Sequence, residues 1–187
     1  MQLSEQQRLS AVCALFNKLF SRHRTCLTGG APEPIYIPAR CPDQVHQLVY
    51  RGDYLSSALH EVAHWCIAGP NRLLMEDFGY WYRPDGRSAA EQRQFEQVEV
   101  KPQALEWMFS IACGHHFTPS QDNLNAPHPP HPNAIQSFKQ VVAEQCLDWC
   151  YSGKLPIRAR QFIEVLVTNL DGADPNNANL YLYALKP

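Results

Sequence analysis

The run LHEVAHW (residues 59–65) contains the pattern H-E-x-x-H, and it lies in an apolar stretch that we expect to be helical from residue 54 to residue 68. On an α-helix, side chains four positions apart lie one above the other, with about 5–6 Å between their Cβ atoms. His60 and His64 can therefore bind one metal ion through nitrogens that lie about 2.0–2.1 Å from it. We expect the fold to be organised around this helix and its metal site.

The burial expected for this helix favours a metal site over a structural role. The stretch is apolar on nearly every side, which is typical of a buried helix, and Glu61 is its only charged side chain. Two imidazoles and a carboxylate are costly to bury unless they are paired or bound to a metal. The alternative is a pair of hydrogen-bonded core histidines. Asp53 can cap the start of the helix, and Gly69 with Pro70 can end it.

Length and composition indicate one globular domain. The chain has 187 residues, of which 45% are hydrophobic and 18% are charged, and these fractions are ordinary for a soluble protein. The net charge of −2 argues against nucleic acid as the main partner. Because no apolar run reaches about 18 residues and the N-terminus is unlike a signal peptide, we expect no contact with a membrane. Seven cysteines without a C-x-x-C pair are expected to be reduced thiols in a cytoplasmic protein.

Hydrophobic periodicity predicts an α+β fold that is mostly helical and has a small β-sheet. Helices are expected over residues 3–21, 54–68, 88–113, 133–151 and 156–169, strands over residues 33–38, 45–50 and 77–82, and loops over residues 28–32 and 117–132. The metal-binding helix should be central and should pack against residues 95–113. The strands are too few for a jelly-roll barrel. We expect a single domain over residues 1–170 and a loosely ordered tail over residues 171–187.

The helix expected over residues 88–113 offers candidates for a third metal ligand. Its acidic and amide side chains recur at spacings of three and four and share one stripe if Pro102 does not break the helix. They are Glu96, Glu99, Gln103 and Glu106. A solvated acidic face is the ordinary explanation of such a stripe, and a carboxylate ligand is the other. Two histidines and a carboxylate suit non-haem Fe(II) as well as catalytic Zn(II), so the spacing leaves the metal open.

Four separated blocks of the chain together resemble one known family. They are EPIYIPA (residues 33–39), HEVAHWCIAG (residues 60–69), EDFGYWYRPDGR (residues 76–87) and FEQVEVKPQALEW (residues 95–107). In this order they resemble the bacterial elongation factor P hydroxylases. The resemblance implies a metal-dependent enzyme that hydroxylates the β-lysyl-modified lysine of elongation factor P, a modification that supports translation. It also implies His60, His64 and Glu99 as the metal ligands. The acidic stripe itself keeps Glu96 as an alternative ligand or as a residue that supports one.

The chemistry that this resemblance implies limits the cofactor and suggests roles for further residues. Hydroxylating an unactivated carbon with molecular oxygen needs a redox-active metal, so Fe(II) is the expected cofactor, although the purified protein could hold another divalent ion. Glu61 would be a catalytic residue that orients a ligand or relays a proton. A pocket for the cationic substrate would be rimmed by acidic and aromatic side chains. The candidates are Asp77, Tyr80, Tyr82 and Asp85.

Two other functions use the same residues. A small cytosolic zinc metallopeptidase would bind zinc through His60 and His64 and would use Glu61 as the general base on a bound water. A non-catalytic, metal-stabilised binding module would hold the ion in a saturated site, and metal removal would unfold it. A hydroxylase differs from both because it needs oxygen and adds one oxygen atom to its substrate.

Overall fold

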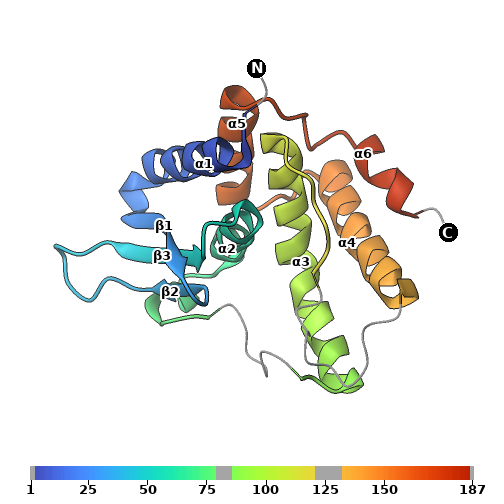
Figure 1. The fold of residues 1–187 in the computed structure, drawn as a ribbon, viewed down its shortest axis with the longest axis horizontal. Helices are drawn as coiled ribbons and strands as arrows, with labels where there is room; N and C mark the ends of the chain where they lie inside the picture. The colour runs from blue at the N-terminus through green and yellow to red at the C-terminus, as the bar shows by residue number, and fades with distance from the viewer. Residues whose placement is uncertain (1–2, 79–85, 121–131, 186–187) are drawn as a thin grey trace.

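The structure is a computed structural model that describes residues 3–78, 86–120 and 132–185. Its helices are α1 (Glu5–Leu19), α2 (Leu55–Ile67), α3 (Ala89–Cys113), α4 (Pro132–Ser152), α5 (Ile157–Asn169) and α6 (Asn179–Leu182), with 3-10 turns at Ser21–His23, Arg72–Leu74 and Tyr183–Leu185. Its strands are β1 (Thr25–Ala31), β2 (Ile35–Ile37) and β3 (His46–Arg51). The described chain therefore has the α+β, mostly helical fold that was predicted, and it forms no barrel (Figure 1).

Helix α2 lies at the centre of the molecule, as its apolar sequence predicted. It packs along α3 and on β3, and it also contacts α1 and α5 (Figure 1). The helix ends at Ile67, just before Gly69 and Pro70, as expected. The cap predicted at Asp53 is wrong, because the N-cap is Tyr54 and no side chain caps it. Gly52 has a φ of 53° and turns the chain between β3 and α2, which leaves Asp53 one position outside the cap.

Aromatic rings tie α2 to its neighbours on one side. Trp65 of α2 packs edge-on against Phe16 at a centroid distance of 5.2 Å and against Phe20 at 4.7 Å. Phe162 of α5 packs edge-on against Phe16 at 5.8 Å. Helix α1 begins with a capping box that Ser4 and Gln7 form. The core on this side of α2 is therefore built from α1 and α5.

The sheet has the strand order β1-β3-β2, with β1 parallel and β2 antiparallel to β3. Strand β2 is at an edge of the sheet, where the prolines that bound it are tolerated. Residues 28–32 were predicted to be a loop, and this is wrong because residues up to Ala31 belong to β1. Gly29 lies against the ring of Tyr50, where a Cβ atom would come within 2.5 Å of it. The glycine that suggested a loop is thus needed for close packing inside the sheet.

Helix α3 runs without a break through Pro102 to Cys113 and ends at Gly114, which has a φ of 70°. Its continuity places the predicted acidic stripe on one face. Only the start of the strand predicted over residues 77–82 is described, where Asp77 makes an isolated bridge with Tyr36. Over the described ranges, none of the helices has the length and hydropathy that crossing a membrane requires.

The C-terminal segment differs from the loosely ordered tail that was expected. Tyr181 is fully buried, and its hydroxyl donates to the carbonyl of Pro175 at 2.7 Å. Its ring packs edge-on against Trp107 of α3 at 5.3 Å. Two buried residues, Tyr181 and Ala184, hold this segment on α4 and α3 (Figure 1). The sequence analysis missed them because the chain after Asp171 is mostly polar.

Candidate metal centre

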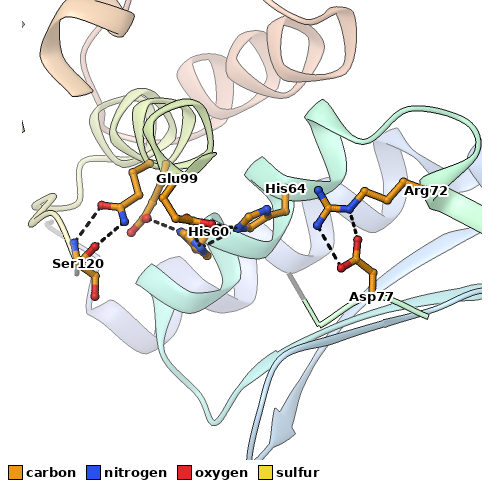
Figure 2. A network of polar contacts seen from close by, with 8 residues as sticks. His60, His64, Arg72, Asp77, Glu99 and Ser120 are labelled. Carbon is orange, nitrogen blue, oxygen red and sulfur yellow. Dashed lines mark hydrogen bonds and ion pairs between the residues drawn. The ribbon is translucent and has the colours of Figure 1, made fainter. Parts of the chain in front are cut away.

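His60 and His64 lie one turn apart on α2 and face each other. Their Nε2 atoms are 3.0 Å apart, and the two rings meet edge-on with centroids 4.7 Å apart (Figure 2). The helix supplies this geometry locally, because the rise over four residues stacks the two side chains. Both rings are partly exposed, so the site lies at the edge of the core and remains reachable.

Glu99 of α3 completes the group from the facing helix. Its Oε1 lies 3.4 Å from Nε2 of His64, and its Oε2 lies 3.5 Å from Nε2 of His60 (Figure 2). One ligand atom from each of these three residues lies within 4.8 Å of the other two. Within the described chain, Glu99 and not Glu96 joins this group. Glu96 is half-buried and accepts a hydrogen bond from Gln92 at 3.2 Å.

The donor set fits a divalent metal ion. Bonds of about 2.1 Å place neighbouring donors about 3.0 Å apart at a right angle and about 3.4 Å apart at a tetrahedral angle. The three separations of 3.0, 3.4 and 3.5 Å match this range. Oε2 of Glu99 is buried and has no hydrogen-bond partner among the described residues, although an unpaired buried oxygen is costly. A cation bound between the three residues would satisfy it.

Glu106 also belongs to this centre, although the sequence analysis named it only as one member of the acidic stripe. It lies two turns along α3 from Glu99, it is only 7% exposed, and its Oε2 lies 2.8 Å from Nδ1 of His60. Nδ1–H donates to this carboxylate, so Nε2 is the atom of His60 that faces the other ligands. The acidic stripe contained Glu106, but the sequence did not show which carboxylates of the stripe face α2.

The charges of the site shift the pKa values of its members in opposite directions. Burial lowers the pKa of His60, but the hydrogen bond and charge of Glu106, together with Glu99 and Glu61, outweigh it and raise the pKa to about 10. Burial raises the pKa of Glu99, but the adjacent His64 and His60 outweigh it, so the pKa is lowered. Burial raises the pKa of Glu61 in spite of the opposing charges of the two histidines. Glu99 is therefore held as an anion, as a metal ligand should be.

Gln103 binds the backbone of the segment that follows α3, close to the candidate metal centre. Its fully buried side chain donates to the carbonyl of Ser120 at 2.6 Å and accepts from the Ser120 N–H at 3.0 Å (Figure 2). Gln103 lies between Glu99 and Glu106 on the same face of α3. This pair of hydrogen bonds fixes the backbone at Ser120 relative to the ligand-bearing helix.

A small cavity lies beside His64, on the side where Glu61 and Trp65 point. Its volume is about 20 Å³, and its wall includes Glu61, His64 and Asp77. Asp77, predicted to bind substrate, forms a two-pronged ion pair with Arg72 there (Figure 2). The other three predicted substrate-binding residues, Tyr80, Tyr82 and Asp85, lie outside the described residues.

Two comparisons with known proteins agree with each other. The family model described as elongation factor P hydroxylase matches residues 15–180. The chain is also 44% identical over 173 residues to a protein of Haemophilus influenzae named elongation factor P lysine hydroxylase. That alignment covers 92% of this chain and 94% of the relative.

Proposed function

Because the chain belongs to the elongation factor P hydroxylase family, we propose that it hydroxylates elongation factor P on the lysine that carries a β-lysyl group. The match over nearly the whole chain supports the activity. The metal-dependent chemistry is supported by the close grouping of His60, His64 and Glu99, which come from two helices. Two histidines and one carboxylate leave coordination positions open, which suits an oxygenase better than a saturated structural site.

We propose Fe(II) as the metal held by these three residues. Bound iron would supply the redox chemistry that zinc lacks, since an unactivated C–H bond must be oxidised. One atom of molecular oxygen would enter the substrate as a hydroxyl group, and the other would leave as water after two electrons arrive from a reductant. The hydrogen bond from His60 to Glu106 holds the imidazole in the orientation that presents Nε2.

We assign Glu61 the role of a proton carrier or orienting group beside the metal. It is next to His60 in sequence and lines the cavity beside His64, but it is not one of the grouped ligand atoms. Burial raises the pKa of Glu61, which favours the protonated form that a proton donor needs. Asp77, which lines the same cavity, remains a candidate substrate contact. Tyr80, Tyr82 and Asp85 remain candidates on the basis of the sequence alone.

We place this reaction in the cytoplasm. All seven cysteines are free thiols, as expected of a protein in a reducing compartment. The partners of the reaction would be β-lysylated elongation factor P and molecular oxygen, with no part for nucleic acid or a membrane.

The test is an oxygen-transfer assay on the purified protein substrate. The protein is loaded with Fe(II) without oxygen and is then incubated in air with β-lysylated elongation factor P and a reductant. Mass spectrometry should show the gain of one oxygen atom, and the gain should be absent in His60→Ala, His64→Ala and Glu99→Ala. Protein loaded with zinc should also be inactive. An unchanged substrate mass with iron-loaded wild-type protein would refute the proposal, and cleavage of a peptide by the zinc form would favour a peptidase instead.

A further inference from the structure

The short segment that follows α2 exposes three large apolar side chains. Leu74 is 74% exposed, Met75 is 52% exposed and Phe78 is 44% exposed. Single exposed apolar residues are common on proteins and need no explanation. Elsewhere in the described chain, however, no stretch of five residues exposes three large apolar side chains. Residues 74–78, called the apolar segment below, therefore stand out as a candidate interaction surface.

The backbone of the apolar segment is held in place. Asp77 and Tyr36 of β2 exchange backbone hydrogen bonds at 2.7 Å and 3.0 Å, and the hydroxyl of Tyr36 donates to the carbonyl of Leu73 at 3.2 Å. The side chain of Asp77 also forms the ion pair with Arg72 (Figure 2). Because these contacts already order the backbone, a partner that docks on the segment pays little conformational entropy there.

The apolar segment borders the candidate metal centre. Leu73 and Asp77 line the cavity that His64 also lines, and each of the two is followed directly by an exposed apolar residue. Adjacent Cα atoms are about 3.8 Å apart, so Leu74 and Phe78 lie next to the wall of this cavity. A protein whose modified side chain reaches the centre must place its own surface against the residues around the centre. The apolar segment is among these residues.

We propose that the apolar segment is part of the docking surface for elongation factor P, with Leu74, Met75 and Phe78 as its apolar contacts. The identity of this partner rests on the proposed function, in which the modified lysine belongs to a folded protein and not to a free small molecule. A second copy of the chain is the other occupant to consider, but a copy on this segment would obstruct the approach of a protein substrate to the centre. The segment thus recognises the protein that carries the lysine, while the metal centre acts on the modified side chain.

The test is the affinity of the zinc-loaded protein for β-lysylated elongation factor P, measured by isothermal titration calorimetry without iron or reductant, so that no turnover occurs. Leu74→Ala and Phe78→Ala should each raise the Kd about tenfold, because each removes apolar surface that the complex buries. Leu182→Ala is the matched control. It truncates an exposed leucine of α6, which lies on the other side of the molecule from β2 (Figure 1), and it should leave the Kd unchanged.

Zinc content and melting temperature separate a lost docking contact from damage to the centre or to the fold. Both should stay at the wild-type value in each variant. If Phe78→Ala lowers stability, Leu74→Ala and Met75→Ala still decide the question, because these two side chains are more than half exposed.

Four results would each overturn the proposal. They are wild-type affinity in the variants of the apolar segment, an equal loss of affinity in Leu182→Ala, no measurable complex with the wild type, and a dimer of this chain that Leu74→Ala dissociates without changing the Kd for elongation factor P. The titration needs no oxygen. Binding that depends on the apolar segment but is not followed by hydroxylation would therefore count against the proposed function alone. Hydroxylation by the wild type, with no effect of the variants on binding, would count against this inference alone.

Discussion

Removing the carboxylate of Glu106 would test whether the metal centre depends on a residue that is not itself a ligand. Oε2 of Glu106 lies 2.8 Å from Nδ1 of His60 in a largely buried position. This contact keeps a proton on Nδ1 and leaves Nε2 as the donor atom for a metal. In Glu106→Ala the Nδ1–H loses its acceptor, and the ring can move its proton to Nε2, where it blocks metal binding.

The size of the effect follows from the loss of this hydrogen bond. A buried donor left unpaired costs about 1–3 kcal/mol, and every 1.4 kcal/mol is a tenfold change in an equilibrium constant. Metal affinity should therefore fall by about 5-fold to 150-fold, which agrees with the range of about 10-fold to 100-fold found when groups that support metal ligands are removed. Glu106→Gln keeps an oxygen that can accept from Nδ1–H but loses the charge, so its affinity should fall between the wild type and Glu106→Ala.

The assay is competition for Zn(II) against a coloured chelator at fixed pH, with thermal melting of each variant as a check of folding. Glu144→Gln on the surface of α4 is the control for a change in net charge and should bind zinc as the wild type does. Wild-type affinity in a folded Glu106→Ala variant would show that the hydrogen bond does not position His60. If Glu144→Gln weakened zinc binding as much as Glu106→Ala does, the effect would come from net charge and not from the hydrogen bond to His60.

Four further substitutions test the candidate metal centre and the packing of the fold. Glu99→Ala should lose most of its bound metal while it remains folded. Metal analysis after gel filtration measures this loss. Full metal content in the variant would show that Glu99 is not a ligand. Gly172→Ala should destabilise the fold by about 1–3 kcal/mol in urea unfolding, because its Cβ would lie 2.1 Å from the carbonyl oxygen of Ala112. Gly69→Ala, with open space around it, should change stability by less than about 0.5 kcal/mol, and equal effects of the two would contradict this packing. Arg158→Ala removes hydrogen bonds to two carbonyls at the end of α2 and a cation–π contact over the ring of Trp65 at 4.5 Å. The melting temperature should therefore fall by about 2–8 °C. An unchanged melting temperature would show that Arg158 does not stabilise the end of α2.

The helices could be predicted because their signals are local. Ser4 with Gln7 and Ser88 with Glu91 form capping boxes at the starts of α1 and α3, and Gly114 ends α3 in a left-handed conformation. Each signal depends on residues within one or two turns of each other. The apolar sequence of α2 likewise indicated its burial, since only the centre of the fold can cover a helix that is apolar on every side.

Strand β1 could not be predicted because its partner is distant in the sequence. Thr25 pairs with His46 in a parallel arrangement, and the two strands are joined by a connection that itself contains β2. No local pattern reports such a pairing, and the glycines of β1 favour a loop. Tyr181 illustrates the same limit, because its burial depends on Trp107 of a helix far away in the chain.

The candidate metal centre also has a part that could be predicted from local sequence and a part that could not. The separation of His60 and His64 follows from helix geometry alone, but a stripe with carboxylates at spacings of three and four contains several that could face them. Which carboxylate meets the histidines depends on how α3 is rotated about its axis against α2, and packing of the whole core sets that rotation. The family resemblance pointed to Glu99, and the structure places Glu99 against both histidines and adds Glu106 behind His60.

The pattern H-E-x-x-H therefore predicts a place where a metal ion could bind, but it does not predict a reaction. In a zinc peptidase its glutamate acts on a bound water, whereas here Glu61 lines a separate cavity beside His64. The backbone of α2 fixes the two histidines in either case. The groups around the glutamate include Tyr36 of the sheet and the ion pair of Arg72 and Asp77. These groups come from elements outside the motif, so the motif alone does not determine the chemistry of Glu61.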